Sequence, residues 1–568
     1  IKKKYILNFF ANTTNIMKIK DFINNTFGYK PKNEYQFTLP DNPEIDTEKY
    51  NNTNSDKIEN IYSQIDANLK YIKTKYNTLI NSDIITREFT LNTGSKQYKA
   101  FILYIDGMVD SQILNDFVLK PLMLKNKFCN NETSKIIVQK GKKSNIANFI
   151  QDCLIPQNNI KQQSSFKDIF SGVNSGNCAL FVDTLSVGFD IDVKGFKQRS
   201  ISKPENEIVI KGPHEAFVEN MRTNTTLLRR FTNNENLIIE NTKVGKITQT
   251  NCAICYIKDI ANDALVAETK YRLNNLEIDS LLSAGELEQL LTDTNSLGVP
   301  KILVSERPDY AVKSLLQGRV IILINGSPYA LILPAILIDF LTSPEDTNLK
   351  PQFANFLKVV RIISSFFALL LPGLYIAITN FHREIIPTEL LFSILSSRQS
   401  VPFPIIVEIL IMEISFEIIR EAGLRVPSPI GPTLGIVGAL VLGQAAVSAA
   451  IVSPILIIIV AITGMSSFAI PDFTFSFHLR FFRFVFILLG FLAGFLGIGM
   501  GLFIYISSLC DLETFGVSYT IPYAPAVNSK NNGFMLSPIW KREDRATYLA
   551  TKKEKKQNKI SMKWRKIN

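Results

Sequence analysis

The feature that most restricts the possible folds of this chain is an apolar stretch that carries four carboxylates. From Pro402 to Gly423 most positions are Ile, Leu, Val, Phe, Met or Ala, a composition typical of a membrane-spanning helix. A charged side chain at the centre of a bilayer costs about 3 kcal/mol even on lenient scales. The segment should therefore face water, a partner helix or a pore. Its charged residues are Glu408, Glu413, Glu417, Arg420 and Glu421.

The overall composition predicts a soluble part joined to a membrane part. The 568 residues are too many for one hydrophobic core, so several domains are expected. Mean hydropathy is +0.11, although the chain contains 62 Lys and Arg and 51 Asp and Glu residues. From Lys541 to the end there are eleven basic and three acidic residues. A basic tail after apolar spans indicates the cytoplasmic side of a membrane rather than a nucleic-acid partner.

Strand and helix patterns alternate between residues 95 and 335. Before them, apolar residues three and four apart from Ile58 to Leu79 predict an amphipathic helix, and residues 213–231 predict another that opens at Pro213. Residues 318–340 are long enough to cross a bilayer. However, Asn325-Gly326 between two β-branched runs favours a β-hairpin.

These patterns predict an α+β/α-helical membrane protein. A cytoplasmic N-terminal half of two small α/β subdomains precedes a polytopic helical membrane domain and a basic C-terminal tail. The expected parts are a flexible Asn/Lys-rich segment (1–55), an amphipathic helix (56–94), a first α/β subdomain (95–211), a connecting helix (212–235), a second α/β subdomain (236–345), a membrane domain (356–510) and a cytoplasmic basic tail (511–568).

The membrane part offers one candidate crossing too many. The start shows no secretory signal, so both termini are expected in the cytoplasm and the number of full crossings should be even. One candidate must therefore be partial, and the segment rich in glutamate is the suspected one. Pro372 and Pro454 are the expected helix breaks. The five candidates are residues 356–379, 402–421, 431–449, 452–470 and 481–508.

The polar residues of the membrane part have two possible roles. Glu413, Glu417 and Glu421 are four apart and share one helix stripe, whereas Glu408 points to the opposite side. The stripe could line a water-filled pore, or it could hold helices or subunits together, with Glu417 paired to Arg420 or to a neighbour. Gln444 and Ser448 could likewise line a narrow pore or bond across a tight helix crossing.

No arrangement of residues indicates an enzyme. Only three histidines occur, far apart in sequence, and no Ser/His/Asp or Cys/His pattern stands out. Cys252 and Cys255 form a CxxC motif without a second pair, in a strand that would place them on opposite faces. We therefore expect no catalytic residues, no metal site and no cofactor.

A long ordered set of motifs resembles the A subunits of the GerA-type spore germinant receptors. The resemblance covers roughly residues 95 to 525. It is carried by "YIDGMVD", "KGPHEAFVENMRTNTTLLRR", "SERPD", "GRVIILINGSP", "SPED", "HREIIPTELLFSI" and "FPIIVEILIMEISFEIIREAGLRVPSPIGPTLGIVGALVLGQAAVSAAIVSP".

This resemblance implies a multi-pass protein of the inner membrane of a dormant bacterial endospore. Its implied partners are further copies of the chain in a ring, a pentamer in the family pattern, a transporter-like B subunit, a lipoprotein C subunit, membrane lipid and monovalent cations. The implied function is a nutrient-gated cation channel that triggers germination. Two alternatives stay open: a non-conducting scaffold of the receptor cluster, and the related sporulation-protein branch of the family.

Overall fold

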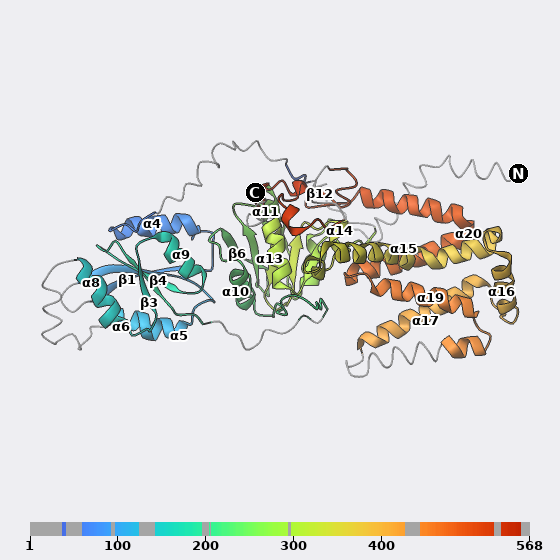
Figure 1. Cartoon of the computed structure of the whole chain (residues 1–568), viewed down its shortest axis with the longest axis horizontal. Helices are drawn as coiled ribbons and strands as arrows, with labels where there is room; N and C mark the ends of the chain where they lie inside the picture. The colour runs from blue at the N-terminus through green and yellow to red at the C-terminus, as the bar shows by residue number, and fades with distance from the viewer. Residues whose placement is uncertain are drawn as a thin grey trace, which may run out of the picture.

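The computed structural model describes residues 37–40, 59–92, 97–123, 143–195, 204, 206–293, 297–425, 443–527 and 535–557. Two subdomains built on β-sheets and one helical domain follow one another along the long axis of the molecule (Figure 1). The segment predicted to be flexible, 1–55, lies outside the described residues except for 37–40. There the Leu39 N–H donates to the Gly516 carbonyl at 3.4 Å.

The first subdomain is a five-stranded antiparallel sheet with helices on both faces. Its strand order is β1-β2-β4-β5-β3. One face packs on α4 and α9, and the other on α5, η1, α6, α8 and η3 (Figure 1). The elements are α4 (Ile65–Tyr76), β1 (Ile84–Asn92), β2 (Gln97–Ile105), α5 (Ser111–Ile113), η1 (Leu114–Leu119), α6 (Lys120–Met123), α8 (Lys143–Phe149), η3 (Ile150–Leu154), β3 (Ile160–Gln163), α9 (Phe166–Asn174), β4 (Cys178–Val182) and β5 (Gly188–Ile191).

The second subdomain repeats the topology of the first. Its antiparallel sheet has the order β6-β7-β9-β10-β8, which is the same pattern when strands are numbered within each subdomain. In both, one helix precedes the first strand and one lies between the third and fourth strands. The elements are α10 (Met221–Phe231), β6 (Leu237–Val244), β7 (Thr250–Ile257), α11 (Asp263–Asn274), α12 (Ala284–Leu291), β8 (Leu303–Ser305), α13 (Pro308–Gln317), β9 (Val320–Ile324) and β10 (Ala330–Leu333).

Two predicted helices are shorter than expected. The 56–94 region contains a helix only over Ile65–Tyr76, because residues 84–92 pair with β2 as the edge strand of the first sheet. The connecting helix begins at Met221 rather than at Pro213, since the Asn220 side chain accepts from two N–H groups of the first turn and caps it there. Segment 213–218 has no regular secondary structure, and the Phe217 N–H donates to the Glu306 carbonyl at 2.7 Å.

The β-hairpin predicted for residues 318–340 is confirmed. β9 and β10 pair antiparallel with Leu323 opposite Ala330, and Gly326 occupies the left-handed region in the connection at φ +91°. Every residue of both strands is buried, which explains why the sequence is as apolar as a membrane span.

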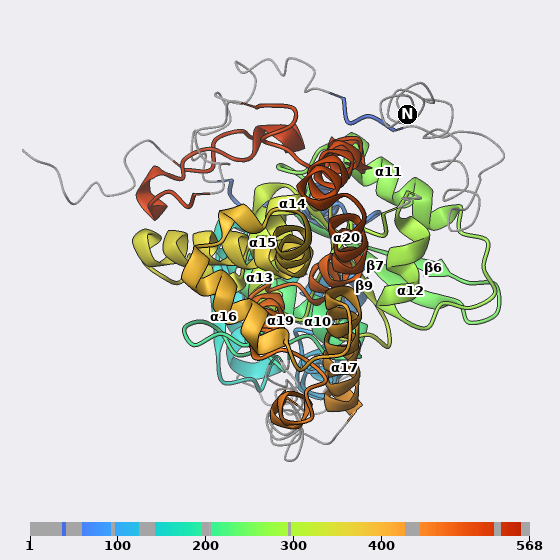
Figure 2. The ribbon, with the colours of Figure 1, turned by 90° about the vertical axis from the view of Figure 1, so that its right-hand side faces the viewer.

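The helical domain begins after two short elements that follow β10. Seen from its far end, α15, α19 and α20 lie together while α17 and α16 lie at the edge (Figure 2). Its elements, with the short ones around it, are α14 (Leu337–Phe340), η4 (Pro344–Thr347), α15 (Pro351–Phe381), η5 (Arg383–Ile385), α16 (Thr388–Arg398), α17 (Ile405–Arg425), α19 (Pro454–Phe468), α20 (Phe473–Cys510), β11 (Glu513–Thr514), β12 (Val517–Ser518), η6 (Ile539–Lys541) and η7 (Thr547–Leu549).

The prediction that residues 481–508 make one crossing is wrong, because α20 reverses direction at Gly494. That residue has φ +59° and ψ −140°, outside the helical region. His478 Nε2 and the Tyr505 hydroxyl, 27 residues apart, are hydrogen-bonded at 2.9 Å. In a straight helix this separation would be about 40 Å. Residues 473–510 therefore form a helical hairpin, and Gly494 supplies a backbone conformation that other residues adopt only at a cost.

The other helix predictions have mixed outcomes. α17 is one continuous helix of 21 residues, about 31 Å long, and it is not among the described helices that are long and apolar enough to cross a membrane. That it crosses only in part stays a prediction. α15 continues through Pro372, which is therefore not a break, whereas α19 begins at Pro454 as expected. The candidate crossing at 431–449 lies outside the described residues up to residue 442.

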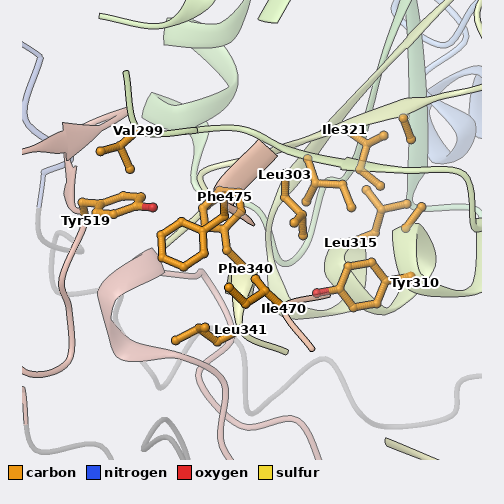
Figure 3. Packing of buried hydrophobic residues seen from close by; sticks show 14 of the residues in the cluster. Val299, Leu303, Tyr310, Leu315, Ile321, Phe340, Leu341, Ile470, Phe475 and Tyr519 are labelled. Carbon is orange, nitrogen blue, oxygen red and sulfur yellow. The ribbon is translucent and has the colours of Figure 1, made fainter. Parts of the chain in front are cut away.

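The second subdomain and the helical domain share one hydrophobic core. Phe340 stacks on Phe475 with 6.1 Å between ring centroids, and the same cluster includes Tyr310, Ile321 and Tyr519 (Figure 3). The C-terminal region, predicted as a separate tail, packs on the same subdomain. Lys552 and Lys553 form ion pairs of 2.5 and 2.9 Å with Asp263 and Asp259, respectively, near the start of α11.

Candidate functional site

The carboxylates of α17 meet arginines from neighbouring helices. Glu413 is fully buried and forms an ion pair with Arg483, a buried residue of α20. The Arg483 Nε also donates to the backbone carbonyl of Ala368 in α15 at 2.9 Å. One guanidinium thus connects α17, α20 and α15 deep within the helical domain.

A second pair lies one turn further along the same two helices. Glu417 accepts from Arg480 of α20 at 2.5 Å. The sequence left two partners open for Glu417, Arg420 or a neighbour, and the partner here is Arg480 of the neighbouring helix. Arg420 donates to the Ser467 hydroxyl at 2.5 Å and lies 4.0 Å from the Phe468 ring centroid. Arginines three apart on α20 therefore match glutamates four apart on α17.

Glu408 lies on the other side of α17, as its spacing predicts. Its carboxylate accepts from Arg398 of α16 at 2.9 Å and from the Ser453 N–H at 3.1 Å. Ser453 is the residue immediately before α19, so the carboxylate sits at the positive end of that helix. Glu408 thereby holds α16 and α19 to α17.

The remaining candidates lie at exposed positions. Glu421 is exposed at the last turns of α17. Gln444 and Ser448 lie in a helical stretch, 443–448, and both side chains are exposed. The structure therefore separates the predicted polar residues into a buried or half-buried set and an exposed set.

The buried pairs are costly to disturb but contribute little net stability. Among the described residues, Glu413 Oε1 and Arg483 Nη2 have no hydrogen-bond partner, and neither does Glu417 Oε1. Such incomplete satisfaction reduces the gain from burying two charges. Removing one member leaves the other charged and buried, which typically costs about 3–5 kcal/mol. The pairs therefore specify how the helices pack.

The partners Arg398, Arg480 and Arg483 were not identified from the sequence. Arg480 immediately precedes the candidate crossing at residues 481–508. The available signal was the pair of arginines three apart in "RFFRFVFILLG", which is as improbable in lipid as the glutamates are. Considering both stripes together would have predicted their pairing.

In the N-terminal half, buried arginines hold the two subdomains and their loops in place. Arg229 of α10 is buried and binds both carboxylate oxygens of Asp83 at 2.8 Å, and Asn81 as well. The Asn81 side chain also bonds to β6 through Leu237 and Ile239. The segment before β1 is thus fixed against the second sheet.

A second polar cluster forms where β8 ends. The Glu207 carboxylate accepts from the Ser305 hydroxyl at 2.6 Å and from the Glu306 N–H at 2.9 Å. Burial raises the pKa of Glu207 to about 7, an effect that these two hydrogen bonds oppose. The neighbouring Arg307 is buried and donates to the Pro213 carbonyl at 2.9 Å.

No metal centre is found among the described residues, since none of their His, Cys, Asp and Glu side chains form a group of three able to hold an ion. Cys252 and Cys255 are buried on opposite faces of β7, in different hydrophobic clusters, as their spacing predicted. Burial raises the pKa of the Cys252 thiol to about 12, so it is not a reactive thiolate.

These observations define a class of protein: a pair of repeated α/β subdomains, the second of which shares a hydrophobic core with a helical domain that contains buried Arg–Glu pairs. Two helices of the described residues, Pro351–Phe381 and Phe473–Cys510, are long and apolar enough to cross a membrane by length and composition. The reversal at Gly494 means that the second comprises two shorter arms.

The chain belongs to the GerA spore germination protein family. The family model described as "Bacillus/Clostridium GerA spore germination protein" matches residues 70–548. Spore germination protein KA of Bacillus subtilis (strain 168) is 36% identical over 86% of this chain and 87% of its own length. Spore germination protein B1 of the same organism is 38% identical over 81% of this chain and 92% of its own length.

A solved structure also matches. It is the crystal structure of the N-terminal domain of the A subunit of the Bacillus megaterium spore germinant receptor GerK3. This structure is 29% identical to the chain, covers 50% of this chain and 98% of its own, and has a TM-score of 0.37.

Proposed function

We propose that this chain is the A subunit of a nutrient-sensing germinant receptor in the inner membrane of the spore. The observation that carries the proposal is the family match over residues 70–548. The two apolar helices support placement in a membrane. In this proposal both termini are cytoplasmic, and a transporter-like B subunit and a lipoprotein C subunit complete the receptor.

Within the receptor, the buried glutamates act as structural ties. Glu408 and Glu413 are nearly inaccessible to solvent, and each has an arginine partner from another helix. A permeating cation would have to compete with the guanidinium of that arginine for the same carboxylate. We therefore assign Glu408, Glu413 and Glu417 to helix packing rather than to cation selection.

The conducting function is assigned to a ring of copies, with a pentamer as the expected stoichiometry. Gln444 and Ser448 are exposed, uncharged and four apart on one helix face. In a ring, such a face supplies hydroxyl and amide oxygens to monovalent cations without holding them too tightly. Opening of this path in response to the nutrient would start germination.

A second candidate is a scaffold subunit that conducts nothing. The internal neutralisation of the α17 carboxylates favours it, because it removes the strongest cation-attracting groups of the helical domain. The related sporulation-protein branch of the family would be compatible with either candidate.

The test is ion release by the complete receptor reconstituted in liposomes loaded with K⁺. The variant Gln444→Leu/Ser448→Leu is compared with Gln399→Leu/Ser507→Leu, which changes an exposed amide and an exposed hydroxyl elsewhere in the same domain. The channel proposal expects nutrient-dependent K⁺ release that only the first variant abolishes, with oligomer size unchanged. Absence of release from an intact wild-type oligomer under every nutrient would establish the scaffold role.

A further inference from the structure

Large apolar side chains are exposed at the first turns of α15 and on the short helix η6. Phe353 and Phe356 of α15 are 62% and 67% exposed, and Ile539 and Trp540 of η6 are 61% and 48% exposed. We call these four residues the basal patch. Apolar side chains that gather at one surface mark a contact with a partner or a membrane.

Hydrogen bonds hold the two halves of the basal patch together. The Asn355 side chain of α15 donates to the Leu536 carbonyl at 3.2 Å and accepts from the Leu536 N–H at 2.6 Å. The same two segments line a cavity of about 490 Å³, to which Pro351 and Trp540 both contribute. Residues 536–540 therefore lie against the first turns of α15, although they are far from α15 in sequence.

Close contacts between α15 and α20 show the height of the basal patch along the helical domain. A Cβ at Gly490 would lie 2.5 Å from the Gly373 carbonyl oxygen, and one at Gly494 would lie 3.1 Å from the Phe381 Cβ. The two helices therefore run in the same direction from these shared levels. Counting back along both at about 1.5 Å per residue, α20 begins level with about residue 358 of α15. Phe356 lies close to that level, and Phe353 lies beyond it.

The start of α20 is also where a membrane boundary is expected. The first arm of α20, residues 473–493, is about 31 Å long, which matches the hydrocarbon core of a bilayer, about 30 Å. The headgroup region adds about 5–7 Å on each side of that core. Phe475, in the first turn of α20, stacks on Phe340, so this boundary faces the second subdomain. With the first arm crossing the hydrocarbon, the basal patch falls at the edge of the core and in the headgroup region.

The chemistry of the exposed residues changes across this boundary in the order expected of a membrane surface. Farther into the helical domain, exposed Phe367 continues the face of α15 that carries Phe353. In the opposite direction, exposed Lys350 stands three residues before Phe353, and exposed Lys541 directly follows Trp540. Tryptophan is favoured at the headgroup level, and basic side chains just outside the apolar region reach lipid phosphates. This order favours lipid over a protein partner.

We infer that the basal patch inserts into the membrane interface, so that η6 forms a second lipid contact beside α15. The inference rests on the membrane placement of α15 in the proposed function. The C-terminal region then touches the lipid surface at η6 and continues to the second subdomain, where Lys552 and Lys553 pair with Asp263 and Asp259. It acts as a strap that fixes the height of the second subdomain above the membrane.

The test measures the depth of Trp540 in a bilayer by fluorescence quenching. The chain has two tryptophans, Trp540 and Trp564, so Trp564→Phe leaves Trp540 as the only one. The full chain with this substitution is reconstituted in vesicles of phosphatidylglycerol and brominated phosphatidylcholine, with bromine either near the headgroup or near the middle of the acyl chain. Bromine quenches tryptophan only at close range. We expect the greater loss of Trp540 emission with bromine near the headgroup, and protection of Trp540 from acrylamide in the water.

Two matched controls place a single tryptophan elsewhere in a Trp540→Phe/Trp564→Phe background. Phe117→Trp replaces a side chain of similar exposure, 46%, in the first subdomain, which lies at the opposite end of the molecule from the helical domain (Figure 1). Its emission should be quenched by acrylamide and by neither lipid. Phe367→Trp replaces an exposed side chain farther along α15 and should lose most emission with bromine near the middle of the acyl chain.

The controls separate failure of this inference from failure of the proposed function. Quenching of Trp540 by acrylamide alone would overturn the inference, and so would protection from both quenchers, which would mean that protein covers the patch. If Phe367→Trp is quenched by lipid and Trp540 is not, only the inference fails. If Phe367→Trp also escapes lipid quenching, the membrane placement of α15 fails and the inference fails with it. Should Trp564→Phe not fold, a fluorophore on Ile539→Cys in a cysteine-free background gives the same comparison.

Discussion

Replacing Glu413 by Gln should strongly destabilise the helical domain, because it leaves the Arg483 guanidinium charged and buried. Both side chains are about 1% exposed or less, and the guanidinium has one other protein partner, the Ala368 carbonyl. Breaking a buried pair from one side typically costs about 3–5 kcal/mol. We expect a loss of that size in the free energy of unfolding of the detergent-solubilised protein.

The matched comparison is with ion pairs of increasing exposure. Glu417 is 26% exposed, so Glu417→Gln should cost less than Glu413→Gln. Glu277, paired with Lys246 in the soluble half, is 82% exposed, and Glu277→Gln should cost at most about 1 kcal/mol. Urea or thermal unfolding followed by intrinsic fluorescence gives all three values in one series.

A double substitution tests whether the cost comes from an unpaired charge. Glu413→Leu/Arg483→Met removes both charges and keeps most of the volume, so it should be nearer to wild type than either single variant. The reasoning fails if Glu413→Gln is no more harmful than Glu277→Gln. It also fails if the double variant loses as much stability as the sum of the two single variants.

Three further predictions concern other parts of the chain. A Cβ at Gly490 would lie 2.5 Å from the Gly373 carbonyl oxygen in α15, whereas one at Gly499 would meet nothing within 4 Å. Gly490→Ala should therefore lower the melting temperature of the protein. Gly499→Ala should leave the melting temperature unchanged or raise it slightly. The pKa of Glu207 is about 7 in the folded state, compared with 4.5 in the unfolded state. The contribution of Glu207 to the free energy of unfolding is therefore complete below pH 4.5 and is lost as the pH rises through 7. The Glu207→Gln variant should lack that decline, worth at most about 3 kcal/mol, when unfolding is measured from pH 4.5 to 8. In a cysteine-free background, Lys555→Cys should react with an impermeant thiol reagent only after the membrane is permeabilised, and labelling of intact membranes from outside would refute cytoplasmic termini.

Sequence patterns identified part of the N-terminal half, where the elements are short and regular. The β9–β10 hairpin was predicted from Asn325-Gly326, and of these two residues Gly326 has a positive φ in the connection, +91°. The edge strand β1 was missed because residues 84–92 were included in the segment predicted as an amphipathic helix (56–94), and their pairing with β2 shows that they form a strand. The repetition of one strand order in both subdomains was also invisible, since topology leaves no periodic signal.

In the helical domain, the sequence identified the unusual side chains but not their partners. The glutamates of α17 were recognised because charge is rare in apolar helices. Their ion pairs depend on which helices lie beside α17, and that depends on the reversal at Gly494. Glycine within an apolar helix is common in membrane proteins, so one among several glycines of α20 could not be singled out. A single backbone conformation thus changed both the topology and the interpretation of the site.

The shared core limits how a signal can pass from the soluble half to the helices. Phe340 and Tyr519, on either side of the junction, belong to the same cluster as Phe475 at the start of α20. Packed interiors do not deform gradually, so a rearrangement of the second subdomain must either leave this cluster unchanged or move α20 as a unit. Arg480 and Arg483 lie on the same arm of α20 and would carry α17 with them through Glu417 and Glu413. The buried pairs therefore allow a movement that begins in the sheet to reach the helix on the far side of the domain.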